Sequence, residues 1–283
     1  MILAAVRAEW FKLVRRRALW VTIGLMLVLA VGIEYLLVYV VAAHPPARAA
    51  GAGAALAAAR TALYPASVIK KSVASVSSLI GIFALIVGVL AQGSEYSWGT
   101  VKTAWVQLPG RISIVLGQLT SLAVLSLIMA LTLIAADSLA SYLIGTLDSQ
   151  SSTWPSALDF LKGIGAAWLI LYLLAVLGFG LATLFKQSAM AIGLGLAYVL
   201  VIENLVFGLL ANLGDPWNQI QQWFPISNAG YLQDSFGKLN SAVTATVTGS
   251  APASATHAVI VLGLWVIGIA AVSASVVRMR DVT

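Results

Sequence analysis

Long apolar stretches divide this sequence, and the first runs from Ala18 to Val41. Hydrophobic residues make up 60% of the 283 residues and charged residues only 9%, whereas a soluble domain carries about 25% charged residues. A soluble chain of this composition would expose large apolar patches and aggregate. The sequence therefore predicts an all-α, polytopic membrane protein.

The apolar stretches predict six transmembrane helices in a single domain that covers residues 1–283. The expected spans are 18–41, 74–91, 113–136, 160–184, 189–212 and 257–277. The third span can extend past Asp137, and the fourth and fifth are joined by a tight turn. Three other segments are assigned separately: an interfacial helix at 1–17, a polar loop at 93–112, and an insertion of short helices on the outer side at 214–255.

Residues 1–17 have the pattern of an amphipathic helix that lies in the headgroup plane. Apolar side chains, including Trp10, recur at helical spacing, and the opposite face holds Lys12, Arg15 and Arg16. The alternative is the start of a signal peptide, but the following apolar run is longer than the 7–15 residues of a signal-peptide core. We expect a membrane-surface helix that leads into the first span.

The distribution of basic residues predicts which side of the membrane each loop occupies. Six spans place both termini on one side, and that side is assigned Arg7, Lys12, Arg15, Arg16, Arg17, Lys102, Arg111, Lys186, Arg278 and Arg280. Fewer basic residues, spread over longer loops, fall on the other side: Arg48, Arg60, Lys70, Lys71, Lys162 and Lys238. By the positive-inside rule both termini are cytoplasmic, and the Ala-rich composition fits a bacterial plasma membrane.

Motifs of the common enzyme classes are missing from the sequence. Gly237-Lys238 is followed by Leu239 and does not form a P-loop, and neither a His-Glu-x-x-His motif nor a Gly-x-Ser-x-Gly motif occurs. The chain has no cysteine, which excludes thiol chemistry and disulfides. The net charge of +6 lies beside the spans, so it indicates topology control and contact with lipid rather than binding of nucleic acid. We expect no bound metal or cofactor and no catalytic activity in this chain.

Three carboxylates fall within or near the expected spans, namely Glu34, Asp137 and Glu203. An ionised carboxylate at the centre of a bilayer costs about 2.5–3.5 kcal/mol on insertion scales, so it faces a cavity or a partner. We expect Glu34 and Asp137 to be paired or hydrated near the outer interface. Glu203 lies just past the middle of its span and is the strongest candidate for a role in a transport pathway.

Small residues recur every fourth position in two of the expected spans. Gly178 and Ala182 show this spacing in the fourth span, and Ala189, Gly193 and Ala197 show it in the fifth. Such residues allow helices to approach closely, although the spacing is common in Ala-rich and Gly-rich membrane proteins.

The polar segment between the second and third spans can form a short amphipathic helix from Glu95 to Gln107. Trp98 and Trp105 would lie on one face with Lys102 more exposed, and Pro109-Gly110 would end the helix. The alternative is an interfacial loop anchored by its tryptophans.

In three features the sequence resembles the permease subunits of ABC-2-type ATP-driven exporters. The first is the amphipathic start, from Glu9 to Arg17, that enters the first span. The second is Glu95-Tyr96-Ser97-Trp98-Gly99-Thr100-Val101-Lys102, which resembles the Glu-x-x-x-Gly-Thr segment of that family. The third is the order of six spans with an enlarged connection between the fifth and sixth.

The resemblance implies that this chain works with other subunits. An ABC ATP-binding subunit would bind ATP and Mg²⁺, and a second permease copy or a related permease would complete the translocation path. Glu95, Trp98, Gly99, Thr100 and Lys102 would belong to a coupling helix docked against the ATPase. The alternative function, from the residues alone, is an ion- or proton-coupled secondary transporter that uses Glu203.

Overall fold

A computed structural model of the chain describes residues 2–44, 53–97, 111–150, 153–206, 209–210, 214, 217–237 and 254–279. Regular structure in these ranges is entirely helical, which confirms the predicted all-α class. The helices are α1 (Ile2–Val14), α2 (Arg17–Leu29), η1 (Ala30–Leu37), α3 (Val38–Ala43), α4 (Gly53–Thr61), η3 (Pro65–Ser67), α5 (Val68–Ser75), η4 (Val76–Ile80), α6 (Gly81–Ser97), α8 (Arg111–Leu147), α9 (Ala157–Phe185), α10 (Ser188–Leu196), η5 (Ala197–Val206), α12 (Trp217–Gln221), α13 (Pro225–Asp234) and α14 (Ala255–Met279).

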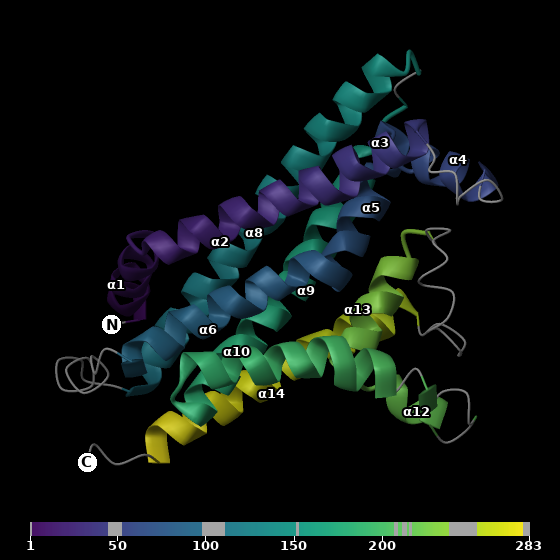
Figure 1. The fold of residues 1–283 in the computed structure, drawn as a ribbon. Coiled ribbons are helices and arrows are strands. Elements are labelled where there is room, and N and C mark those ends of the chain that lie inside the picture. Colours follow the sequence, from purple (N-terminus) through teal and green to yellow (C-terminus); the bar gives the residue numbers. More distant parts are fainter. Residues whose placement is uncertain are drawn as a thin grey trace.

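Figure 1 shows these helices as an elongated bundle with two distinct ends. One end holds α1, the last turns of α6 and the end of α14, and we call it the terminal end. The opposite end holds α4, α12 and the start of α14, and we call it the loop end. The two ends are joined by tilted helical runs that lie side by side.

Five helical runs are long and apolar enough to cross a membrane: Arg17–Ala43, Pro65–Glu95, Ile112–Leu147, Ala157–Phe185 and Ala255–Met279. The predicted fifth span is present as a shorter apolar helix, Ser188–Glu203, which η5 extends to Val206. The predicted limits of the second span were too narrow, because that run begins at Pro65. Lys70 and Lys71 therefore lie within a span rather than in the loop before it.

Glycines set the distance between α6 and α9 at the centre of the bundle. A Cβ atom added to Gly178 would collide with the backbone of Leu85, and one added to Gly88 would collide with the backbone of Ala175. Ala182, one turn along α9 from Gly178, is fully buried. The small residues of the fourth span therefore serve a helix crossing, whereas a Cβ on Gly193 of the fifth would meet nothing within 4 Å.

We predict that Gly178→Leu destabilises the folded protein, because the new side chain forces α6 and α9 apart. Overpacking of a tight core typically costs about 1–3 kcal/mol. Gly193→Leu adds the same side chain to an exposed position and is the matched control. Thermal melting of the detergent-purified protein should show a clear fall for Gly178→Leu and little change for Gly193→Leu. Equal melting temperatures for the two variants would contradict the assigned crossing.

Candidate functional site

Helix α1 is held against the start of α8 by a close contact between small residues. Ala5 is buried, and a Cβ added to Gly117 of α8 would lie 3.1 Å from the Ala5 backbone. Ser121 Oγ donates a hydrogen bond to the Val6 carbonyl oxygen at 3.4 Å. The predicted surface helix thus packs along the bundle through one face while Phe11, on another face, is 56% exposed.

A buried ionic network joins α1 to the last turns of α6. Lys12 Nζ lies 2.6 Å from Glu9 Oε1 and 2.7 Å from Glu95 Oε1. Glu9 and Glu95 are only 4% and 6% exposed. Gln118 Nε2, from α8, donates to Glu95 Oε2 at 3.1 Å. One lysine therefore bridges two buried carboxylates that come from two different helices, and a third helix supplies a further hydrogen bond.

Arg16 makes a second connection between the same elements. It lies at the corner between α1 and α2, and its Nη1 donates to the Leu90 carbonyl oxygen at 2.6 Å and to Ser94 Oγ. Trp20 Nε1 donates to the Val14 carbonyl oxygen at 2.7 Å and fixes the corner from the other side. A cation near the C-terminal part of α6 also interacts favourably with the helix dipole.

The pKa values of the groups on α1 reflect this burial. Burial, followed by the nearby charge of Glu95, raises the pKa of Glu9 above its usual range. Burial alone would lower the pKa of Lys12, but hydrogen bonds to Glu9 and Glu95 outweigh it and raise that pKa. Burial lowers the pKa of Arg16. Lys12 therefore stays charged at neutral pH, which the two carboxylates require.

The predicted coupling residues are only partly within the described chain. Glu95 forms part of the last turn of α6 rather than of a separate helix, and its side chain points into the network. Trp98, Gly99, Thr100 and Lys102 lie outside the described residues.

The predicted interfacial residues take different positions. Trp10 is half-buried against the core, Lys12 and Arg16 face α6, and the Arg15 guanidinium lies 4.1 Å from the centre of the Phe11 ring. Sequence reasoning missed the pairing of Glu9 with Lys12, and it missed Gln118 entirely. The Glu9–Lys12 pair has a sequence signal, since the two residues are three apart on one helix, whereas the contacts of Glu95 and Gln118 depend on how distant helices pack.

A second polar cluster lies inside the spans, nearer the loop end. Ser72 Oγ donates to Asp137 Oδ2 at 2.5 Å, and Lys71 Nζ donates to the backbone carbonyl of Glu34 at 2.6 Å. The Lys71 amino group also lies 4.6 Å from the centre of the Tyr35 ring. Asp137 is fully buried and lies within the run Ile112–Leu147, so the predicted limit of the third span at residue 136 was too short.

Helix α8 continues past Asp137 to Leu147, and Lys71 of the extended second span supplies a compensating charge. Among the described residues, Asp137 Oδ1 and the Tyr35 hydroxyl have no hydrogen-bond partner. Glu34 lies in the π-helical η1. Two of the three predicted pathway carboxylates are thus brought together, and Glu203 is not part of this cluster.

Glu203 instead caps a helix of the insertion. Its Oε1 accepts a hydrogen bond from the Ser227 backbone N–H at 2.8 Å. Helix α13 begins at Pro225, and its N-cap residue Phe224 has no side chain that can accept such a bond. The first N–H groups of a helix need an external acceptor, and Glu203, 2% exposed, provides it from η5.

At the loop end, three side chains converge on Asp148, just beyond α8. Arg60 donates to both carboxylate oxygens, at 3.0 Å through Nε and 2.6 Å through Nη2. The hydroxyls of Tyr64 and Tyr39 donate to the same carboxylate at 2.9 and 3.3 Å. The hydrogen bonds from Arg60 are the main reason that the pKa of Asp148 is lowered. This cluster ties α3, α4 and α8 together.

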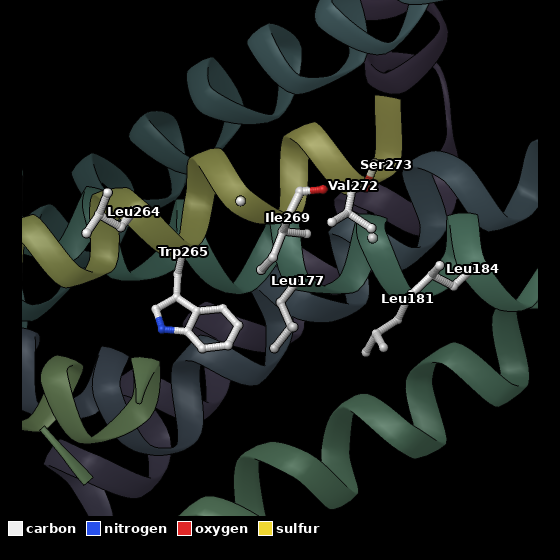
Figure 2. A pocket seen from close by; sticks show the side chains of 10 residues that line it. Leu177, Leu181, Leu184, Leu264, Trp265, Ile269, Val272 and Ser273 are labelled. Atoms are coloured by element: carbon white, nitrogen blue, oxygen red, sulfur yellow. Dashed lines mark hydrogen bonds between the residues drawn. The ribbon is translucent and has the colours of Figure 1, made fainter. Parts of the chain in front are cut away.

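An apolar groove runs between α9 and α14. Figure 2 shows Leu177, Leu181 and Leu184 of α9 and Trp265 and Ile269 of α14 pointing into the same space. The groove has a volume of about 420 Å³. Its lining lacks charged groups, so it offers shape and apolar contact but no chemistry. In the described part of the chain, no three His, Cys, Asp or Glu residues gather where they could hold a metal ion.

Comparison with known protein families shows to which family this chain belongs. The family described as "ABC-2 family transporter protein" matches residues 3–282. The chain belongs to the ABC-2 transporter family. No curated protein matches it significantly. Family membership, together with the membrane-crossing helices, makes this chain a multi-pass permease of an ABC exporter, and the resemblance seen in the sequence is confirmed.

The Asp148 cluster of this ABC-2 permease predicts a pH-dependent stability. The pKa of Asp148 is lowered in the folded protein. The stability that its carboxylate contributes is therefore fully present above the unfolded pKa of about 3.9, and it is lost as the pH falls through the folded pKa. We expect Asp148→Asn to melt below the wild type at pH 7, and the difference to close below about pH 4. A difference that stays constant with pH would contradict this assignment.

The capping role of Glu203 predicts unequal effects for two substitutions. Glu203→Gln keeps a carbonyl oxygen for the Ser227 N–H, whereas Glu203→Ala removes the acceptor and should destabilise α13 by about 0.5–2 kcal/mol. A single cysteine introduced in α13 of this cysteine-free chain should react faster with a maleimide in the Ala variant than in the Gln variant. Equal reactivity in both variants would exclude the cap.

Proposed function

We propose that this permease subunit receives movement from a separate ABC ATP-binding subunit through residues 93–112 and α1 together. The observation that carries the proposal is the Lys12 network, which links α1 to Glu95 in the last turns of α6, at the start of residues 93–112. A push on the segment after Ser97 would reach Glu95 first. Through Lys12 and Gln118 it would then move α1 and α8 as well, so the contact region and the spans respond as one body.

The orientation proposed for the subunit places the terminal end in the cytoplasm. Helix α1 lies at this end and carries Arg7 and Lys12, Arg15 and Arg16 follow it directly, and α6 and α14 end there too (Figure 1). Cytoplasmic loops carry an excess of Lys and Arg. The host membrane that fits the notably Ala-rich chain is a bacterial plasma membrane.

A second permease copy, or a related permease, would complete the transport path. The first and last spans bury only 17% of their most apolar windows, against 61% for the spans Pro65–Glu95 and Ala157–Phe185. These two spans therefore have most of their surface free for lipid or for a partner. The ATP and Mg²⁺ would be bound by the ATP-binding subunit, and this chain would have no catalytic role.

The alternative, a proton- or ion-coupled transporter that works through Glu203, has less support. Glu203 already accepts a backbone hydrogen bond at the start of α13, which gives the buried carboxylate a structural role. A lone chain that drove proton-dependent flux in liposomes, with the flux lost in Glu203→Gln, would favour this alternative.

A charge exchange between Lys12 and Glu95 tests the proposed coupling. We expect Lys12→Glu to lower permease-dependent stimulation of the partner ATPase about tenfold while the complex still forms. Loss of one partner of an ion pair costs about 3–5 kcal/mol when the pair is buried and about 0.2–1 kcal/mol when it is exposed. The Lys12 side chain is 38% exposed, so we expect a cost between these values. Adding Glu95→Lys should restore part of the stimulation.

Arg7→Glu is the matched control, because Arg7 is exposed on the same helix and the substitution changes the charge equally. The measurement is ATP hydrolysis by the ATP-binding subunit with each permease variant in nanodiscs, alongside copurification. Full stimulation in Lys12→Glu, or no rescue by the double variant, would contradict the coupling role of the pair. Failure to copurify any ATP-binding subunit with the wild type would overturn the proposed function itself.

A further inference from the structure

A large cavity at the loop end is separate from every group described above. It has a volume of about 910 Å³ and lies where α5, α9, α13 and α14 meet. Ligand cavities of small molecules commonly measure about 300–1,000 Å³. This cavity is therefore large enough for a lipid headgroup and the first part of its chains.

The residues that line the cavity carry a net positive charge. Lys70 of α5 and Lys162 of α9 line it, and Asp159 is the one acidic residue among the residues that line it. Asp159 accepts hydrogen bonds from Ser156 Oγ and N at 2.7 and 3.2 Å in the capping box of α9. The Asp159 carboxylate is thus already hydrogen-bonded at the start of α9. Two ammonium groups against one carboxylate leave a charge near +1, which matches one phosphodiester.

The chain just after α13 passes close to Lys70. A Cβ atom added to Gly237, just after that helix, would lie 3.6 Å from Lys70 Nζ. The backbone of Gly237 has φ +101, a conformation that glycine adopts readily. The glycine therefore allows the chain to turn close to the lysine, which lines the cavity.

The deeper wall of the cavity is apolar and aromatic. Trp168 and Leu169 lie on α9 about 9 and about 10.5 Å further from the loop end than Lys162, at a rise of about 1.5 Å per residue. Trp168 Nε1 donates to the Ala123 carbonyl oxygen at 2.9 Å, which fixes the ring. Phe236, just after α13, and Val259 of α14 add apolar surface to the lining. From the loop end inward, the basic groups therefore come first and apolar groups follow. A membrane lipid has the same order, with a charged headgroup followed by apolar chains.

We propose that this cavity binds an anionic phospholipid, with the phosphate between Lys70 and Lys162 and the chains along Trp168 and Leu169. Anionic headgroups gain about 1 kcal/mol from each nearby lysine, whereas the ammonium of a zwitterionic headgroup is opposed by the same charges. The site does not depend on the ATP-binding subunit or on the transported substrate.

Gly165 offers a way to block the cavity without disturbing the fold. It lines the cavity, and a Cβ added to it would meet nothing within 4 Å. Gly165→Leu therefore fills open space near the lysines. Gly263→Leu is the matched control, because a Cβ there also meets nothing within 4 Å and Gly263 does not line the cavity.

The experiment counts bound lipids by native mass spectrometry on the delipidated, detergent-purified chain titrated with dioleoyl phosphatidylglycerol. Dioleoyl phosphatidylcholine and free glycerol phosphate are tested in parallel. The wild type should bind one phosphatidylglycerol more tightly than the others. Lys70→Gln with Lys162→Gln should weaken that site roughly thirtyfold, because two such interactions multiply. Lys186→Gln, at the terminal end, is the charge control.

The outcomes separate the proposal from simpler explanations. Equal affinity for phosphatidylglycerol and phosphatidylcholine, or equal loss in Lys186→Gln, would overturn the charge assignment. Glycerol phosphate binding as tightly as the lipid would overturn the role of the apolar wall. Retention of the site in Gly165→Leu, with an unchanged melting temperature, would place the lipid elsewhere. Loss in Gly165→Leu but not in Gly263→Leu supports the cavity.

Discussion

The ion pair between Lys12 and Glu95 decides how the terminal end of this permease is built. Two carboxylates that are almost fully buried, Glu9 and Glu95, are stabilised there by a lysine on the surface helix. Removing Lys12 would leave two buried carboxylates without the charge that compensates them. The position of α1 is therefore fixed by charge, and its contact with α8 through Ala5 and Gly117 sets only how close it lies.

The rest of the bundle is stabilised by different interactions at its centre and at its loop end. Its centre depends on close backbone approach, with Gly88 and Gly178 at the crossing of α6 and α9. Its loop end depends on carboxylates that organise loops and short helices, with Asp148 bound by Arg60 and Glu203 capping α13. A rigid terminal end and a loop end built from separate small units suit a subunit that receives force at one end and changes shape at the other.

Much of the architecture was predictable from the sequence because lipid imposes a simple pattern. Apolar runs gave the spans, and the amphipathic start gave α1. Side-chain partners were not predictable: Asp137 was expected at the interface and is buried beside Ser72, because α8 and the second span both extend further than hydropathy indicates. Glu203 was expected in a pathway and lies at the start of α13. Polar residues inside long spans obscure helix ends, and pairings between distant helices leave no periodic signal.

Double electron–electron resonance, which measures the distance between two spin labels, tests most directly whether Lys12 holds α1 and the start of α8 as one rigid body. Spin labels replace Phe11 and Ile112, which are 56% and 44% exposed, in complexes with the ATP-binding subunit. The wild type should give the same narrow distance distribution without nucleotide and with trapped ATP, and Lys12→Ala should broaden it. A wild-type distance that changes with ATP, unaffected by Lys12→Ala, would contradict the account.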